Sequence, residues 1–462
     1  MSSYARKVIA VKLTLDHFAG IEHAEIQLDG LTVIAGLNNT GKSTVGKALY
    51  SVFNALNGIQ ARLLRQRRDE IESQAANALR GYMGTVRSKR GRYPNVREVD
   101  AYIDHVMERY GEGQCGSEDP QRARYRSAVI SELLSVADPD AGPEVPASAG
   151  EFVDRLFADI DEILDYPEEE LVKTVLSDYF GDMFHNQIMP LNSGGIRNAS
   201  VELVIKDKPI RISFTGDECD SVVRDVDIEH DALYIADPFV IDTLNRQFQP
   251  GQLDVVEQNL RNRLVDTVGH ASDAGDGLGA NMIRRNIAKD KLADVERILG
   301  GVIPGDIRSL ADGYYLDSPR AGGSVRFENM STGLKSFAVL KMLIERGKFG
   351  ERDVLVLDEP EIHLHPEWQM KYAQVIVLLQ KTFDLTVVVT THSPYFLDAF
   401  DLYSRQYGTS GSASYYESSR DLESNAIVFE DVTGNIDAIY QTMAGPIDVL
   451  NALRDELEER DS

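Results

Sequence analysis

The sequence predicts an α/β fold, a sheet flanked by helices, which is interrupted by a long and mostly helical insertion. Three observations lead to this prediction. A short apolar run at residues 31–35 is followed by a glycine-rich turn and then by apolar residues at helical spacing up to residue 56. A second apolar run, at residues 354–357, ends in two acidic residues and is typical of a buried parallel strand. Between residues 58 and 190 the chain becomes rich in arginine, glutamate and alanine.

Length and composition restrict the class of protein. A chain of 462 residues is too long for one simple core, and its net charge of −26 argues against nucleic acid binding over the whole surface. Cys115 and Cys219 lie far apart and form no metal or disulfide pattern. The first residues lack the apolar core of a signal peptide, and no run approaches the roughly 20 apolar residues of a membrane helix. We therefore expect a cytoplasmic protein without a membrane segment.

The N-terminal residues predict three strands, at 8–15, 21–28 and 31–35, separated by turns at Gly20 and at Asp29-Gly30. The second strand alternates between polar and apolar residues, so we expect one of its faces to be exposed. This part of the chain predicts an N-terminal antiparallel β-subdomain.

The glycine-rich turn after the third strand fits the pattern G-x-x-x-x-G-K-[ST] at every fixed position. Its residues are Gly36, Leu37, Asn38, Asn39, Thr40, Gly41, Lys42, Ser43 and Thr44. Glycines allow a backbone to wrap around phosphates, and the amides at a helix N-terminus point at them. We expect Lys42 to reach the β- and γ-phosphates and the Ser43 hydroxyl to hold Mg²⁺. A chance turn with a solvent-facing lysine is disfavoured by the flanking strand and helix, so the sequence predicts nucleoside triphosphate binding.

Two later strands end in residues that complete such a site. The strand at 354–357 is followed by Asp358, which is expected to hold Mg²⁺ through its water shell, and by Glu359, which is expected to activate the attacking water as general base. The strand at 385–390 leads to His392, which is in a position to contact the γ-phosphate. Surface carboxylates and an ordinary turn histidine are the alternatives.

Two further motifs surround these strands. Ser331 and Gly333 precede an apolar-faced helix, where a serine is a typical N-cap and a capped helix N-terminus is an anion site. His363 and His365 lie in the turn after Glu359 and, with His392, form a possible metal site. This metal site is the less favoured reading, because Mg²⁺ prefers oxygen ligands.

The rest of the chain is assigned more coarsely. Helices are expected at 95–109, 122–136, 151–164 and 168–184, and strands at 200–205, 209–214, 232–236 and 324–327. We assign residues 1–57, 200–250 and 298–445 to one discontinuous domain, 58–190 to a helical insertion, 251–297 to a helical segment broken by a loop at 270–280, and 446–462 to an amphipathic acidic helix.

One segment of the insertion is strongly basic. From Arg62 to Arg92 there are nine basic and three acidic residues, a local charge of +6. A solvated helix face is one interpretation. The others are contact with an acidic partner protein or with DNA.

The four motifs, in their order along the chain, resemble those of the ABC-type ATPase superfamily. The form of the phosphate loop, together with Asp358-Glu359-Pro360 and Thr391-His392-Ser393-Pro394, is similar to the branch that holds RecF, Rad50 and SMC heads and OLD-type ATPases. The turn at 361–366 is particularly like OLD-type and related bacterial "AAA family" proteins of antiphage systems. The resemblance covers residues 1–57 and 298–400, and it implies an ABC-ATPase head with ATP and Mg²⁺ as cofactors.

The resemblance also implies an assembly. In that superfamily two heads sandwich ATP, so Ser331 and Gly333 would act in trans on the nucleotide held by Lys42 of another copy. The chain departs from the family in three ways. The glutamine that normally contacts Mg²⁺ has no clear counterpart, with Gln60 a weak candidate; the signature is shorter than Leu-Ser-Gly-Gly-Gln; and the 62 residues after Phe400 are too few for a TOPRIM domain.

These observations favour a Mg²⁺-dependent ATPase that forms at least a homodimer. Its ATP-driven head pairing would regulate a separate effector, such as a nuclease or toxin, in bacterial antiphage defence. The alternative is a DNA-repair or chromosome-maintenance ATPase that binds DNA directly through Arg62 to Arg92. A transporter ATPase is disfavoured by the short signature and the long insertion.

Overall fold

The computed structural model describes residues 11–85, 96–111, 113, 119–136, 145–189, 198–246, 252–265, 292–310, 313–318, 322–421 and 426–461. The chain divides into two compact units. One comprises Met1–Asn57 and Lys173–Ser462, and the other comprises Gly58–Val172. We call them the head and the helical unit. Within the described ranges, no helix is long and apolar enough to cross a membrane.

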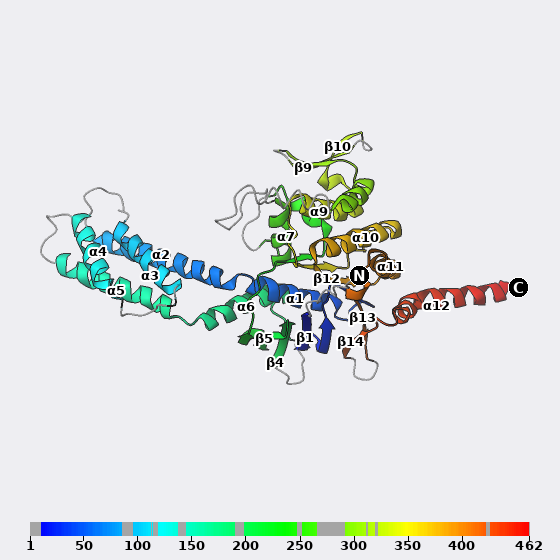
Figure 1. Ribbon diagram of the computed structural model, residues 1–462, viewed down its shortest axis with the longest axis horizontal. Helices are drawn as coiled ribbons and strands as arrows, with labels where there is room; N and C mark the ends of the chain where they lie inside the picture. The colour runs from blue at the N-terminus through cyan, green and yellow to red at the C-terminus, as the bar shows by residue number, and fades with distance from the viewer. Residues whose placement is uncertain are drawn as a thin grey trace, which may run out of the picture. The chain divides into compact units, whose positions relative to one another are not determined.

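The elements can be followed along the chain in Figure 1. The strands are β1 Val11–Phe18, β2 Ile21–Gln27, β3 Leu31–Gly36, β4 Asn198–Ile205, β5 Lys208–Thr215, β6 Glu218–Arg224, β7 Ala232–Ile235, β8 Asp306–Leu310, β9 Gly313–Ser318, β10 Gly323–Arg326, β11 Val354–Asp358, β12 Thr386–Thr391, β13 Ala413–Arg420 and β14 Ile427–Asp431. The α-helices are α1 Lys42–Leu56, α2 Ile59–Thr85, α3 Arg97–Gly111, α4 Arg122–Val136, α5 Val145–Asp165, α6 Glu168–Phe184, α7 Val255–Val265, α9 Thr332–Glu345, α10 Pro366–Phe383, α11 Pro394–Tyr407 and α12 Asp437–Asp461, and residues 292–302 are also helical. Short 3-10 helices span Pro238–Thr243, Phe327–Asn329 and Ser410–Ser412.

The head is built on one eleven-stranded sheet in the order β6-β5-β4-β1-β2-β14-β13-β3-β12-β11-β7. Strands β13, β3, β12, β11 and β7 run parallel to one another, while β13 pairs antiparallel with β14 on its other side. Strands β1, β2, β4, β5 and β6 pair antiparallel and form the predicted N-terminal β-subdomain. A separate antiparallel sheet has the order β10-β9-β8. The predicted α/β fold, a sheet flanked by helices with an antiparallel β-subdomain, is thereby confirmed.

The parallel strands are buried on both faces. On β11, Leu355 and Leu357 join the large core that includes α9, α10 and α11. Val356 points to the other face, where a Cβ on Gly46 of α1 would lie only 2.7 Å from its Cγ1. Because both of its faces are covered, β11 is a continuous apolar run from Val354 to Leu357. Its polar residue, Asp358, stands at the carboxyl end of the strand, where α/β sheets bind ligands.

The helical unit has a core of its own. Helices α2, α3, α4 and α5 contact one another, and the core residues come from all four of them. In this core, Tyr102 stacks on Phe157 with ring centroids 3.8 Å apart.

Several expected elements differ in detail. The first strand begins no later than Val11 and runs on to Phe18, three residues beyond its predicted end, while residues 8–10 lie outside the described residues. The predicted loop at 270–280 also lies outside them. The strand predicted at 324–327 ends at Arg326, since Phe327 begins a 3-10 helix. Strands β6, β8, β9, β13 and β14 were not predicted, because their residues are too polar or too irregular for a clear alternation.

Candidate active site

The loop between β3 and α1 has the backbone of a phosphate-binding turn. Gly41 has φ +77°, and Asn39 also lies in the left-handed region with φ +60°. A Cβ on Gly36 would lie 2.1 Å from the carbonyl oxygen of Ser418 on β13, so only glycine fits against this strand. The Thr40 hydroxyl lies 2.6 Å from the Ser418 hydroxyl and donates to the Leu37 carbonyl at 2.8 Å. The loop is therefore braced from behind by β13.

The remaining loop residues divide between surface and helix. Asn38 and Asn39 are exposed, and the Asn39 carbonyl accepts a hydrogen bond of 3.2 Å from Arg420. Thr44 lies in the first turn of α1, and its amide donates to the Gly41 carbonyl at 3.1 Å.

Lys42 is folded into this loop. Its side chain is 3% exposed, and its Nζ donates to the carbonyls of Leu37 at 2.7 Å and Gly36 at 3.1 Å. Burial lowers the pKa of Lys42, and the nearby carboxylates of Glu359 and Asp358 oppose this effect. A buried ammonium whose partners are weak carbonyl acceptors is suited to exchange them for phosphate oxygens.

Asp358 joins four elements at one point. Its Oδ1 accepts hydrogen bonds from Ser43 of α1 at 2.8 Å and from Thr390 of β12 at 2.5 Å. Its Oδ2 accepts one from the Tyr234 hydroxyl of β7 at 2.7 Å. Burial, and next the adjacent Asp358 carboxylate, raises the pKa of Tyr234, so its phenol is a donor at neutral pH.

The donor set at Asp358 fits Mg²⁺. A serine hydroxyl and a carboxylate are the hard oxygen ligands that this ion prefers, with its other positions left to water and phosphate. Within the described part of the chain, no three His, Cys, Asp or Glu side chains gather in a way that would hold a metal by themselves. His365 instead caps α10, where its Nδ1 accepts from the Glu367 amide at 3.3 Å, and the His363 ring packs edge-on against Phe239.

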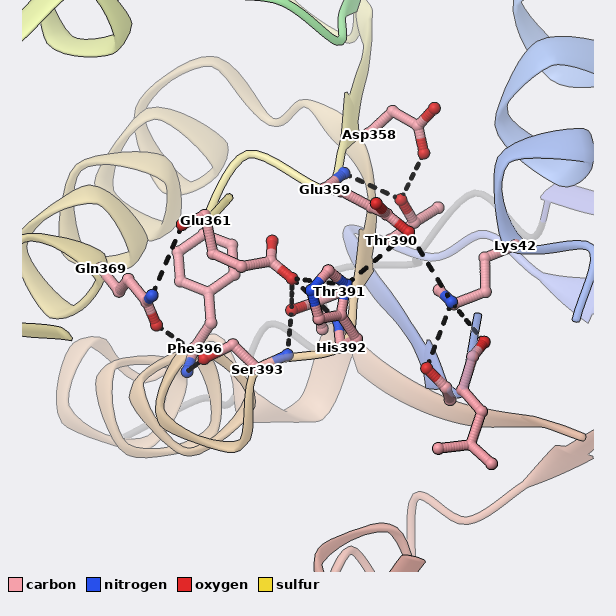
Figure 2. A network of polar contacts seen from close by, with 12 residues as sticks. Lys42, Asp358, Glu359, Glu361, Gln369, Thr390, Thr391, His392, Ser393 and Phe396 are labelled. Carbon is pink, nitrogen blue, oxygen red and sulfur yellow. Dashed lines mark hydrogen bonds and ion pairs between the residues drawn. The ribbon is translucent and has the colours of Figure 1, made fainter. Parts of the chain in front are cut away.

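Glu359 stands next to Asp358, and its carboxylate faces both the Lys42 ammonium and the His392 ring (Figure 2). Its Oε1 lies 3.8 Å from Lys42 Nζ and 3.7 Å from His392 Nδ1. The backbone of Glu359 is left-handed, with φ +47°, and its amide donates to the Thr390 hydroxyl at 3.0 Å and to the Thr390 carbonyl at 3.2 Å. Strained non-glycine backbone of this kind is concentrated at functional sites.

The structure therefore brings together the predicted residues Lys42, Ser43, Asp358, Glu359 and His392. Sequence reasoning did not assign Tyr234, Thr390 or Ser418 to this site. Thr390 stands at the end of a predicted strand, two residues before His392, and its position could have placed it at the site. No sequence pattern indicated Tyr234 or Ser418, because only the order of strands in the sheet brings β7 and β13 close to the site.

The Ser331 and Gly333 segment is placed differently. Ser331 occupies the N-cap position of α9, but its exposed side chain makes no capping hydrogen bond. Gly333 is buried, and a Cβ there would lie 3.0 Å from the Trp368 ring and 3.1 Å from the His363 carbonyl. Among the described residues, no hydrogen bond or ion pair joins Ser331 or Gly333 to the phosphate loop of the same chain.

Two further residues from the sequence lie in the helical unit. Gln60 donates a hydrogen bond of 2.8 Å to Glu168. Arg67, counted as part of the basic segment, is only 4% exposed, and its guanidinium donates to the carbonyls of Ile163, Leu164 and Tyr166. Arg67 therefore belongs to the interior of this unit. Of the other basic residues, Arg87, Lys89, Arg90 and Arg92 lie outside the described residues.

Comparison with known proteins places the chain in a protein family. The family model described as "AAA domain, putative AbiEii toxin, Type IV TA system" matches residues 133–398, more than half of the chain. The SMC head domain from Thermotoga maritima is a structural match with 11% identity and a TM-score of 0.36, covering 92% of this chain and 98% of that one.

Two further solved structures match. An SMC head bound to the C-winged helix domain of ScpA matches with 13% identity and a TM-score of 0.42, covering 93% and 99% of the two chains. An SMC head with an extended coiled coil, bound to the C-terminal domain of ScpA derived from Pyrococcus furiosus, has 12% identity, a TM-score of 0.39 and coverage of 94% and 98%.

Proposed function

This chain belongs to the AAA-domain family described as putative AbiEii toxin of type IV toxin–antitoxin systems, within the ABC-type ATPase superfamily, and from that premise we propose that it hydrolyses ATP. The observation that carries the proposal is the Glu359 carboxylate, which lies 3.8 Å from Lys42 and 3.7 Å from His392. A carboxylate beside a phosphate-binding lysine is in the position of a general base for an attacking water.

Each residue then has a separate task. Lys42 exchanges its loop carbonyls for the β- and γ-phosphate oxygens of ATP, and the loop amides bind the same phosphates. Ser43 and Asp358 would hold Mg²⁺, which supplies neutralising charge to the phosphates when bound. Glu359 takes the proton of the attacking water, and the His392 ring contacts the γ-phosphate.

We further propose that ATP pairs two heads. Ser331 is exposed, and its side chain makes no capping hydrogen bond. Among the described residues, it also has no hydrogen bond to the phosphate loop of its own chain. Large apolar side chains are also exposed on segments that form the site: Leu37 is 56% exposed, Ile362 56% and Tyr395 60%. In a pair of heads these exposed apolar side chains would be covered by the partner. In the paired state, Ser331 and Gly333 of one copy would face the ATP bound by the other.

The output of this pairing is proposed to be a separate effector protein, a nuclease or toxin, in bacterial antiphage defence. The description of the family, which names a toxin–antitoxin system, supports this context. The effector would bind one state of the heads better than the other, so that ATP turnover shifts the population of its active form.

The hydrolysis is tested with Glu359→Gln and Lys42→Ala. Glu359→Gln removes the base but leaves Lys42 and Asp358 in place, so ATP binding should persist while turnover falls at least about 100-fold. Lys42→Ala should lose ATP binding itself. Phosphate release and equilibrium binding of a fluorescent ATP analogue distinguish the two. Wild-type turnover in Glu359→Gln would contradict the assignment of the base.

A further inference from the structure

Glu361 is a buried acid that the mechanism above does not use. It follows β11 by three residues, and its side chain is 3% exposed. Its Oε1 accepts hydrogen bonds from the Thr391 hydroxyl at 2.6 Å and from the His392 amide at 2.8 Å. Its Oε2 is buried without a hydrogen-bond partner among the described residues. Burial raises the pKa of this carboxyl.

Such a group costs stability. An unpaired carboxylate oxygen in the interior loses its hydration without compensation. An apolar side chain of similar volume would avoid that cost at this position. Polar groups of this kind are concentrated at functional sites, and Glu361 therefore calls for a role beyond holding the fold together.

The contacts of Glu361 lead to the end of β12 (Figure 2). The Thr391 hydroxyl, which donates to Glu361, also accepts from the Ser393 amide at 3.0 Å. Ser393 is the N-cap of α11, and its hydroxyl donates to Gln369 of α10 at 2.6 Å. The segment that carries His392 is thus held by bonds on both sides.

The imidazole of His392 lies between two carboxylates. Its Nδ1 is 3.7 Å from Glu359 Oε1 and 3.6 Å from Glu361 Oε1. The ring is partly exposed, so its own packing does not fix it, whereas its backbone amide is bound directly to Glu361. The position of the ring relative to Glu359 therefore depends on the Glu361 oxygen.

We propose that Glu361 is a positioning residue, which uses its acceptor oxygen to hold the end of β12 so that His392 stands beside Glu359 and faces the γ-phosphate. This inference rests on the proposed ATP hydrolysis. Glu361 acts only through Thr391 and His392 and has no contact with the substrate.

The test compares two variants of nearly equal size. Glu361→Met fills the same space without an acceptor, and Glu361→Gln keeps a side-chain oxygen that can accept from both donors. In Glu361→Met, kcat for ATP should fall between about 10- and 100-fold, because both hydrogen bonds that hold the end of β12 are lost, while KM changes less than about 3-fold. Glu361→Gln should retain kcat within about 3-fold. Should Glu361→Met fail to fold, Thr391→Val removes only the donating hydroxyl and should lower kcat in the same direction.

A double-mutant cycle separates positioning from a general loss of structure. In a His392→Ala background, Glu361→Met should cause no further fall in kcat, because the residue it positions is absent. Asp353→Ala is the matched control: this acid stands at the other end of β11 and accepts from the amides of Gly350 at 2.6 Å and Asp231 at 3.1 Å. It should lower the melting temperature without changing kcat.

The outcomes are distinguishable. Undiminished kcat in Glu361→Met, an equal loss in Glu361→Gln, or an equal fall in the His392→Ala background would overturn the inference. An inactive wild-type protein would instead refute the proposed hydrolysis.

Discussion

Tyr234 and Tyr50 form a matched pair in which only one hydroxyl has a partner. Both side chains are fully buried, and their rings pack edge to face with centroids 5.5 Å apart. The Tyr234 hydroxyl donates to Asp358 Oδ2 at 2.7 Å, whereas the Tyr50 hydroxyl has no hydrogen-bond partner among the described residues. Replacing each tyrosine by phenylalanine removes one oxygen atom from almost the same surroundings.

We expect the two variants to differ sharply. Tyr234→Phe leaves Asp358 Oδ2 without its donor, and a hydrogen bond to a charged group contributes about 1.5–3 kcal/mol. Loss of a contact that orients a metal ligand typically lowers metal affinity by about 10- to 100-fold. Tyr50→Phe removes a buried unpaired hydroxyl, so the free energy of unfolding should stay the same or rise by about 1 kcal/mol.

The assay is ATP turnover over a titration of Mg²⁺, with thermal melting of the same samples. Tyr234→Phe should need at least about 10-fold more Mg²⁺ for half-maximal turnover. At saturating Mg²⁺ its rate should approach that of the wild type. Tyr50→Phe should follow the wild-type curve. An unchanged Mg²⁺ requirement in Tyr234→Phe, or the same shift in both variants, would refute the reasoning.

Two further predictions concern stability. Arg67→Ala should lower the free energy of unfolding of the helical unit by about 3 kcal/mol in urea titrations, because its guanidinium donates to three backbone carbonyls at residues 163–166. Arg65→Ala removes an exposed side chain and should change that free energy by less than about 0.5 kcal/mol. Equal effects of the two substitutions would contradict this difference. Burial raises the pKa of Glu361, so the native state binds the proton of this carboxyl more tightly than the unfolded state does. The stability that this proton contributes is fully present below the unfolded pKa of about 4.3, and it is lost as pH rises through the higher folded pKa. Glu361→Gln should therefore become progressively more stable than the wild type as pH rises above about 4.3, and a pH-independent difference in melting temperature would contradict the shift.

The parallel half of the sheet was predictable because its physical signal is local. Strands buried on both faces must be apolar throughout, as at residues 354–357, and a polar residue at their carboxyl end marks the ligand side. The five residues that meet at the site stand at such strand ends or in the adjoining phosphate loop and first turn of α1. Their sequence positions were sufficient to assign them.

The features that were not predicted depend on contacts distant in sequence. Ser418 braces the phosphate loop from β13, 378 residues after Thr40 along the chain, and Tyr234 reaches Asp358 from β7, 124 residues earlier. No pattern within β7 or β13 indicates its neighbour in the sheet. Arg67 was assigned to a charged surface because it lies in a run of basic residues. Its burial became apparent only from the backbone carbonyls that accept its hydrogen bonds.

The central claim is that two heads share each ATP site, and mixing two inactive variants tests it most directly. Lys42→Ala removes ATP binding from its own loop, and Ser331→Arg blocks the surface that would face the ATP of the other copy. In a mixed dimer, the ATP on the Ser331→Arg chain faces an intact Ser331 of the Lys42→Ala chain. Random pairing at equal amounts should then restore roughly a quarter of wild-type turnover, since half of the dimers carry one complete site out of two. If each variant alone is inactive and the mixture is no more active than either, the shared site is contradicted.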